Sequence, residues 1–199
     1  MPLGANKAAI MGVAGVSTGD VVLLSSQTAS GDSSITFSSG IDSTYGEYIF
    51  RFYNINPADD GLTSVRFMWQ VNATDSSSYN ETITSTAFRA FTYESGSPAS
   101  SLAYNTAEDL AQGTGYQHFG GYTGNGADES LAGEFHLFNP SSTTYVKQFS
   151  SQEVNYQYND RVYPSWYAGY INTTTAIDDI QFKFQSGNFD GIIKMWGVK

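Results

Sequence analysis

The 199-residue chain contains no cysteine. This absence excludes disulfide bonds, thiolate zinc sites, iron–sulfur clusters and cysteine nucleophiles. Histidine is almost as scarce, because His118 and His136 are the only two, and the usual zinc-ligand spacings are therefore missing as well. The residue inventory predicts a protein without a cofactor.

The chain also has few positively charged residues. The chain has 9 Lys and Arg residues against 19 Asp and Glu residues, a formal net charge of -10. A surface of this sign repels the phosphate backbone, so we expect no nucleic-acid partner. Apolar runs are short of the roughly 18 residues that a membrane helix needs, and we expect no membrane insertion.

Aromatic residues, in contrast, make up 15% of the chain, and from Asp20 onward apolar residues recur at every second position. This period predicts β-strands with one buried face. In the run 63–72 we expect one set of side chains to face the core, namely Val65, Phe67, Trp69 and Val71. The alternating set should mostly face solvent, namely Ser64, Arg66, Met68 and Gln70. Comparable strands are predicted at 21–26, 34–37, 45–55, 83–93, 130–138, 143–150, 166–171, 180–184 and 192–198.

Clusters of Gly, Pro, Asn and Asp separate these runs, as at 56–61 and 120–126. Many short strands joined by turns are typical of a sandwich or barrel. We predict an all-β, antiparallel, jelly-roll-like β-sandwich domain at residues 20–199, preceded by an extended N-terminal arm at residues 1–19. The one predicted helix covers Thr106–Gln112, with Thr106 as its N-cap.

The arm is rich in Gly and Ala and lacks aromatic residues. Chain termini stay unstructured unless something holds them, so we expect this arm to be held by a partner subunit. Its larger apolar side chains are the candidate docking residues: Leu3, Ile10, Met11, Val13 and Val16.

Motifs for catalysis are weak. Residues 15–19 match the G-x-S-x-G pattern, but they lack the preceding strand and following helix that a nucleophile elbow requires. His136 shares a predicted strand face with Glu134, as an ordinary surface pair would. The acidic loops 58–61 and 126–129 offer oxygen ligands without the EF-hand order, which leaves calcium as a second interpretation of these loops. We expect a protein that is not an enzyme.

One segment concentrates aromatic and amide side chains. Its aromatic members are Tyr156, Tyr158, Tyr163, Trp166, Tyr167 and Tyr170. This composition suits packing in the core or at a subunit interface, and it also suits stacking on the sugar rings of a glycan. Both interpretations remain open from the residues alone.

Four phrases resemble small virion structural proteins of tailed bacteriophages that infect marine bacteria. They are MPLGANKAAIMG at 1–12, FSSGIDSTY at 37–45, LFNPSSTTYVK at 137–147 and GNFDGIIKMWGV at 187–198. The resemblance covers most of the chain. It implies a virion protein that is assembled in the host cytoplasm and has other capsid or tail proteins as partners.

Two functions are compatible with this resemblance. The first is a non-enzymatic surface appendage or capsid decoration protein anchored by the arm, favoured by the lack of coiled-coil heptads and shaft repeats. The alternative is a tail-associated adhesin, a fibre or receptor-binding module that binds host surface glycan. The aromatic content, the sheet edges and the resemblance together predict a homo-oligomer, specifically a homotrimer.

Overall fold

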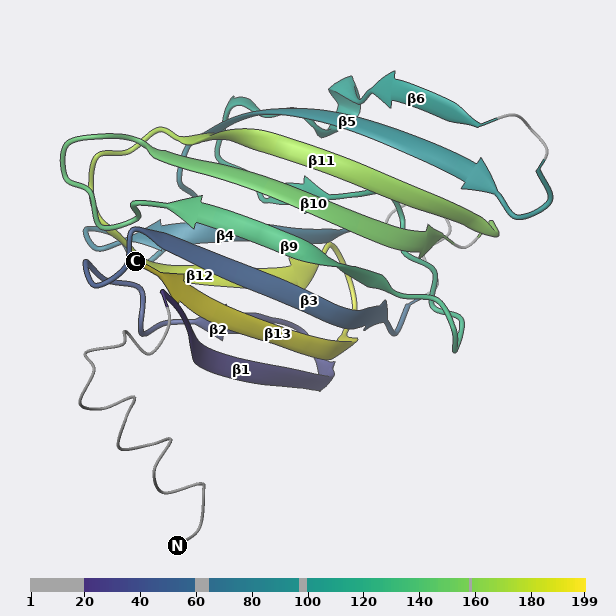
Figure 1. Ribbon diagram of the computed structural model, residues 1–199, viewed down its shortest axis with the longest axis horizontal. Helices are drawn as coiled ribbons and strands as arrows, with labels where there is room; N and C mark the ends of the chain where they lie inside the picture. Colours follow the sequence, from purple (N-terminus) through teal and green to yellow (C-terminus); the bar gives the residue numbers. More distant parts are fainter. Residues whose placement is uncertain (1–19, 60–64, 97–99, 158) are drawn as a thin grey trace, which may run out of the picture.

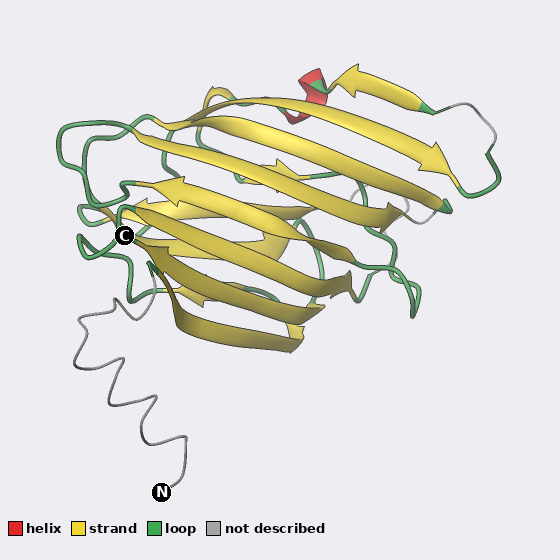
Figure 2. Cartoon of the chain, in the orientation of Figure 1, coloured by secondary structure: helices red, strands yellow, loops and turns green. Residues whose placement is uncertain are grey.

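The computed structural model describes residues 20–59, 65–96, 100–157 and 159–199, and the regular secondary structure within them is almost entirely β-strand (Figures 1 and 2). The helical content of these residues is one 3-10 turn, η1 (Thr106–Glu108). None of their helices has the length and apolar character needed to cross a membrane. The predicted docking residues of the arm, namely Leu3, Ile10, Met11, Val13 and Val16, lie outside the described residues, as does the 15–19 motif.

A nine-stranded antiparallel sheet forms one layer. Its strands lie in the order β1 (Val21–Asp32), β13 (Phe189–Val198), β3 (Glu47–Pro57), β9 (Leu131–Phe138), β10 (Lys147–Gln157), β11 (Arg161–Ile171), β5 (Ile83–Tyr93) and β6 (Ser101–Tyr104). The ninth strand, β7 (Ala111–Gly113), also pairs with β5. β1 and β6 are therefore the outermost strands of this layer (Figure 1).

A four-stranded antiparallel sheet forms the second layer, in the order β2 (Ile35–Phe37), β12 (Ile177–Phe184), β4 (Phe67–Ala73) and β8 (Gln117–Phe119). When the two sheets are considered together, their strand pairs are nested along the chain, so that early strands pair with late ones. β1 pairs with β13, β2 with β12, β3 with β9, and β4 with β8. The remaining strands, β5 to β7 and β10 to β11, widen the larger sheet beyond this nest. The expected antiparallel sandwich is confirmed.

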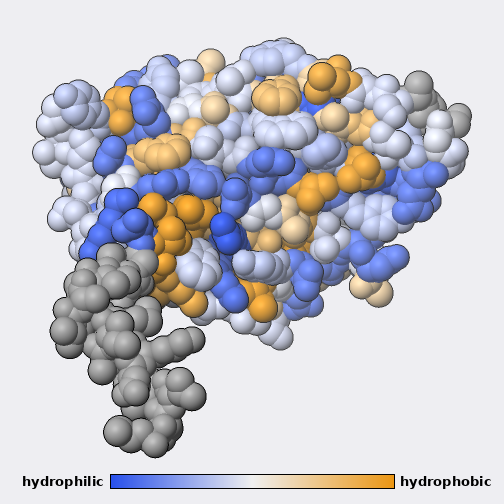
Figure 3. All heavy atoms as spheres, viewed as in Figure 1, coloured by the Kyte–Doolittle hydropathy of each residue, from blue (hydrophilic) through white to orange (hydrophobic). Residues whose placement is uncertain are grey.

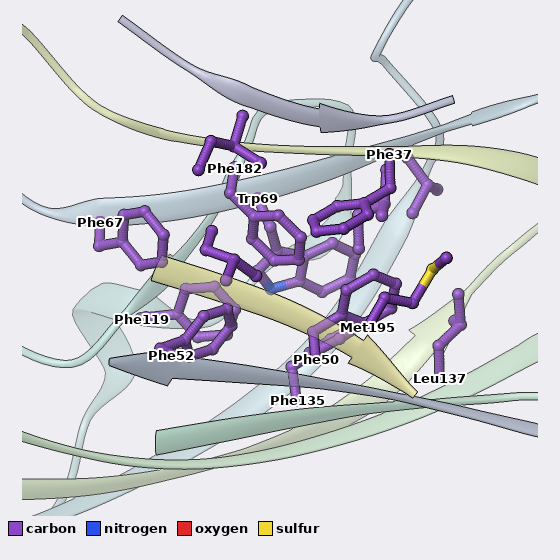
Figure 4. Close-up of a cluster of buried hydrophobic side chains, with 14 of the residues drawn as sticks. Phe37, Phe50, Phe52, Phe67, Trp69, Phe119, Phe135, Leu137, Phe182 and Met195 are labelled. Atoms are coloured by element: carbon purple, nitrogen blue, oxygen red, sulfur yellow. The ribbon is translucent and has the colours of Figure 1, made fainter. Parts of the chain in front are cut away.

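The core between the sheets is a cluster of aromatic rings (Figure 4). Phe182 of β12 lies at its centre, with ring centroids 5.3 Å from both Phe50 and Phe52 of the opposite sheet. Its ring also lies within 6.3 Å of Phe37 and Phe119. Tilted and edge-to-face contacts at these separations add favourable energy to the burial of the rings themselves. These contacts hold the two layers together.

Phe149, Ile171 and Ile83 bring one end of β10, β11 and β5 into this core, and the rest of their inner face is covered by the polar segment 105–130. Gln117 connects the two, because Ser85 Oγ donates to its Oε1 at 2.6 Å and its Nε2 donates to the Glu108 carbonyl at 3.0 Å. Asn155 Nδ2 donates to the Gly121 carbonyl at 3.1 Å. Hydrogen bonds therefore replace the aromatic packing in this half of the sandwich.

The predicted helix Thr106–Gln112 is confirmed at its start and wrong beyond Glu108. Only one 3-10 turn forms, and its preceding residue, Asn105, makes no side-chain capping bond. The chain then becomes extended because it pairs with strand β5. The Ser85 amide donates a hydrogen bond to the Leu110 carbonyl at 2.9 Å. Gln112 belongs to β7. Sheet pairing overrides the local helical signal here.

The prediction that Met68 and Gln70, at alternate positions of the 63–72 run, face solvent is also wrong. Met68 and Gln70 are buried, since loops cover the outer face of β4. Gln70 Nε2 donates to the carbonyls of Glu81 and Gly115, at 3.0 Å each. A buried amide is tolerated because these carbonyls satisfy it.

Replacing Phe182 by Ala tests the aromatic core. We expect the free energy of unfolding to fall by about 3–5 kcal/mol, the usual cost of removing a buried phenylalanine ring. Leu102→Ala is the matched control, since Leu102 is 74% exposed and its loss should cost under about 0.5 kcal/mol. Urea unfolding followed by tryptophan fluorescence measures both, and equal losses would contradict this account of the core.

Candidate functional site

The predicted aromatic segment forms the hairpin of β10 and β11, and strand alternation divides its residues between two faces. Tyr163 and Tyr167 point inward and are only 2% and 3% exposed. Tyr156, Trp166 and Tyr170 are partly exposed on the outer face. These three therefore belong to an accessible surface, whereas the two inward tyrosines do not. Tyr158 lies outside the described residues.

The inward tyrosines are held by interior contacts. Arg89 Nη1 donates to the Tyr163 hydroxyl at 2.5 Å, and the Tyr167 hydroxyl donates to the Gly120 carbonyl at 3.5 Å. Burial raises the pKa of Tyr167 well above its usual value. Of the two interpretations of the segment, core packing applies to Tyr163 and Tyr167.

Trp166 takes part in an aromatic stack on the outer face. Its ring lies parallel to that of Phe88 on β5, with centroids 4.9 Å apart and an interplanar angle of 11°. Phe88 is 47% exposed, so the stack reaches solvent. Tyr104 on β6 lies opposite Phe88 in the strand register, and its hydroxyl accepts a 3.1 Å hydrogen bond from Thr86 and donates to the Asp109 carboxylate. The three aromatic residues lie on neighbouring strands, β11, β5 and β6, and the rings of Trp166 and Phe88 are in contact.

A chain of charged side chains lies on the same face, over β3 and β9. His136 is the centre of this ion-pair chain: its Nδ1 is 2.5 Å from Glu47 Oε1, and its Nε2 is 3.3 Å from Glu134 Oε1. Arg51 Nε lies 3.3 Å from the other oxygen of Glu134. Figure 3, which views this face, shows hydrophilic residues separating patches of hydrophobic ones. The expected His136–Glu134 pair is confirmed, within a longer chain.

A hollow of about 300 Å³ separates the stack from the ion pairs, and we call it the central hollow. The strand register explains it, because Ser150 and Ala168 lie opposite one another between His136 and Thr86 and their small side chains leave space. The next row across the same four strands supplies larger groups, in the order Glu134, Gln152, Trp166 and Phe88.

The central hollow thus presents an aromatic face on one side and a carboxylate, an imidazole and an amide on the other. Such an arrangement can stack on the apolar face of a ring and bond the polar groups at its edge. Its only carboxylate, Glu134, is already paired with Arg51 and His136. The geometry is that of a shallow binding surface.

The other histidine, His118, is partly exposed on β8 and contacts a buried carboxylate. Its Nδ1 is 2.8 Å from Glu108 Oε2, and Arg66 Nη1 is 2.9 Å from Glu108 Oε1. The Glu108 side chain is only 2% exposed. Its ion pair with Arg66, the residue just before β4, holds the covering segment 105–130 to that strand. Its contacts are those of a structural group.

The loop 126–129, a calcium candidate, is closed by its own hydrogen bonds. Glu129 Oε2 accepts from the Gly126 amide at 2.6 Å, and the Glu129 carbonyl accepts from Asn56 Nδ2 at 2.6 Å. Across the described ranges, no group of three or more His, Asp or Glu side chains converges as metal ligands would. Loop 58–61 extends past the described residues at Asp60.

Beneath the outer face lies a buried carboxyl group on β10. Glu153 is 2% exposed; Ser151 Oγ donates to its Oε1 at 3.3 Å, and its Oε2 has no hydrogen-bond partner among the described residues. Burial raises the pKa of Glu153 well above its usual range, because the charged form loses its hydration. The carboxyl group is held in its neutral form over a wider pH range than an exposed one.

No protein-family model, curated protein or solved structure matches this chain. The functional inference therefore rests on the geometry of the outer face and on the resemblance of the sequence phrases.

Sequence reasoning missed most partners of Trp166. Phe88 lies on the predicted strand 83–93 and Tyr104 on the unpredicted strand β6, and neither stands near Trp166 in the chain. Alternation within 83–93 signals that Phe88 shares a face with Thr86, but it does not show which strand lies alongside. Strand pairing brings the stack together.

Replacing Glu153 by Gln tests the buried carboxyl. A raised folded-state pKa means that wild-type stability is greatest below the ordinary pKa of Glu, about 4.3, and falls as the pH rises above it. The Gln variant lacks this titration, so the difference between its free energy of unfolding and that of the wild type should shift in favour of the variant as the pH rises from the ordinary pKa of Glu to the raised folded-state pKa. Urea unfolding across this range measures it.

Asp128→Asn, at an exposed position, is the control for removing one acid from a chain of net charge -10. It should follow the wild-type profile. Parallel profiles for Glu153→Gln and the wild type would show that this carboxyl group does not control the pH dependence.

Proposed function

We propose that this protein is a non-enzymatic virion surface protein that binds host surface glycan through the outer face of its nine-stranded sheet. The observation that carries the proposal is the solvent-exposed stack of Trp166 and Phe88 beside the central hollow. In this form it is the tail-associated adhesin expected as the alternative from the sequence. Its location in the virion rests on the resemblance to structural proteins of tailed bacteriophages.

Sugar rings suit the central hollow for physical reasons. A pyranose has a face of C–H groups, which packs on an aromatic ring, and an edge of hydroxyls, which exchange hydrogen bonds with carboxylates, amides and imidazoles. Glu134, Gln152 and His136 supply such groups within the same hollow as Trp166. The net charge of -10 favours a ligand that is not strongly anionic.

The nested strand pairing supports the finer assignment of a jelly roll. In that fold the first strand pairs with the last, the second with the second last, and so on inward, as two Greek keys require. The pairs β1–β13, β2–β12, β3–β9 and β4–β8 follow this scheme. We propose a jelly roll widened by two insertions, β5 to β7 and β10 to β11.

Strand β1 favours a second function, attachment of the protein to a neighbouring subunit as a capsid decoration. It runs from Val21 to Asp32 and pairs on one side only, with β13, among the described residues. Val21 and Leu23 on it are 51% and 45% exposed. An open edge of this length invites pairing with another chain.

The same edge supports a homotrimer, with the arm at residues 1–19 docking on other virion proteins. Light scattering of the full chain at micromolar concentration should give three times the mass of 21.6 kDa. A mass of one chain would overturn the trimer.

The Trp166→Ala variant tests the glycan function. Loss of the stack should weaken binding by about tenfold or more, which corresponds to about 1.4 kcal/mol. Binding is screened on an array of O-polysaccharides from marine bacterial lipopolysaccharides and then measured by calorimetry. Leu102→Ala, on the same face but outside the central hollow, should bind as the wild type does.

Circular dichroism of both variants establishes that they remain folded. A wild-type protein that binds nothing on the array would count decisively against the adhesin.

Labelling the C-terminus at Lys199 and imaging intact particles distinguishes the two functions. An adhesin should be labelled at the tail, in a few copies, whereas a decoration protein should be labelled over the whole shell. Shell labelling together with no glycan binding would make the attachment function of β1 the primary one.

A further inference from the structure

We propose that the outer face binds a linear oligosaccharide chain along β9 and β10, and that one end of this groove takes an uncharged sugar. This inference rests on the proposed glycan function and specifies its ligand class. It comes from the arrangement of four hollows on one face of the molecule.

Two further hollows follow the central hollow toward one end of β9. It shares Glu134 and Gln152 with a hollow of about 480 Å³ over β3, β9 and β10. That hollow in turn shares Ala132 and Val154 with one of about 420 Å³, which extends to Tyr156 on β10. The shared lining residues place these three hollows side by side along β9 and β10.

Toward the other end of β9 the central hollow adjoins the largest one, of about 610 Å³, which we call the end hollow. Its wall includes Phe138, whose ring stacks on His136 of the central hollow with centroids 6.2 Å apart and planes 23° apart. Gln148, two residues before Ser150 on β10, also lines it.

The resulting groove is longer than one sugar. Its outward residues on β9 run from Ala132 to Phe138, which at about 3.3 Å per residue is about 20 Å. A single ring occupies only part of that length, so several linked rings are needed to contact all of it. The groove therefore selects for a chain rather than a terminal sugar.

The end hollow has a distinct chemistry. Its aromatic members, Tyr45, Phe138 and Tyr145, accompany amide and hydroxyl side chains, and none of the described residues that line it is charged. In a chain of net charge -10, such an uncharged, aromatic and hydrogen-bonding hollow suits a neutral sugar.

The walls of the end hollow are held in place before any ligand arrives. Lys147 is fully buried, and its Nζ donates to the carbonyls of Ser142 and Thr173, at 2.6 and 3.1 Å. Ser142 Oγ accepts from the amide of Tyr145 at 3.0 Å, which fixes the turn that carries this exposed tyrosine. A site already held in its binding shape loses less entropy when a ligand binds.

Tyr45 on the opposite wall depends on a glycine of β13. A Cβ at Gly197 would lie 2.6 Å from the Tyr45 ring, so only glycine lets the ring lie flat against that strand. The ring also meets Tyr48 edge-on, with centroids 5.9 Å apart.

The occupant is a saccharide rather than a peptide strand because the groove lies on the face of the sheet. β9 pairs with β3 and β10, and β10 pairs with β9 and β11, so their backbone donors and acceptors are used within the sheet. A peptide that adds to a sheet needs a free edge. Recognition here is left to side chains, and the aromatic, amide and hydroxyl groups present match sugar rings.

The test measures affinity against chain length. The full-length protein is titrated by calorimetry with single sugars, tetramers and octamers prepared by partial hydrolysis of the marine O-polysaccharide that binds most tightly on the array. We expect affinity to rise at least tenfold from single sugar to octamer. Equal affinity per molecule at all lengths would overturn the groove while leaving the glycan function intact.

Two variants divide the groove. Tyr145→Ala should weaken octamer binding about tenfold and leave single-sugar binding at the central hollow unchanged, because Tyr145 lies only in the end hollow. Trp166→Ala should weaken both. Leu102→Ala is the matched control, since Leu102 and Tyr145 are both 74% exposed.

The remaining outcomes are also decisive. If both variants bind the octamer as tightly as the wild type does, the groove is overturned. Absence of binding by every O-polysaccharide would reject the glycan function itself, and with it the groove. Self-association of the wild type that Tyr145→Ala or Trp166→Ala abolishes, without glycan binding, would identify the face as an interface between copies of this chain.

Discussion

The contact on which the rest of the molecule depends is the packing of Phe182 against rings of the opposite sheet (Figure 4). Strand alternation extends its effect to the far face. Phe52 and Phe135 point into this cluster, so Arg51 and Glu134, their neighbours in the chain, must point outward. The ion-pair chain on the outer face is thus positioned by aromatic packing on the inner one.

The other half of the nine-stranded sheet is stabilised in a different way. Hydrogen bonds through Gln117 and Asn155 hold the segment 105–130 against β5, β11 and β10, and they leave the buried Glu153 carboxyl only partly satisfied. This half carries the Trp166–Phe88 stack on its outer face. The central hollow lies where the aromatic half and the polar half meet, and each half supplies one wall of it.

The proposed binding groove lies on a sheet face rather than at an edge, which has functional consequences. The backbone of β9 and β10 is fully engaged in the sheet, so recognition falls to side chains that can change without disturbing the strand pairing. In the proposed function as a virion glycan-binding protein, this separation would let the face follow changes in host glycans. Among the described residues, β1 pairs only with β13, and its other edge is the one proposed for contacts with other subunits.

Much of the fold follows from the sequence alone. The two-residue period of apolar side chains identified the β-class and many core residues, including Phe67, Trp69 and Phe182. The aromatic segment was also identified, although strand alternation later divided it between two faces, with Tyr163 buried and Trp166 accessible. Only the tertiary structure decided the site, because pairing between distant strands brings Trp166 against Phe88. It also brings His136 against Glu47, although the two residues are 89 positions apart in the chain. Local periodicity specifies which way a side chain points but not which strand lies beside it, and the same non-local pairing turned the predicted helix at 106–112 into an extended segment along β5.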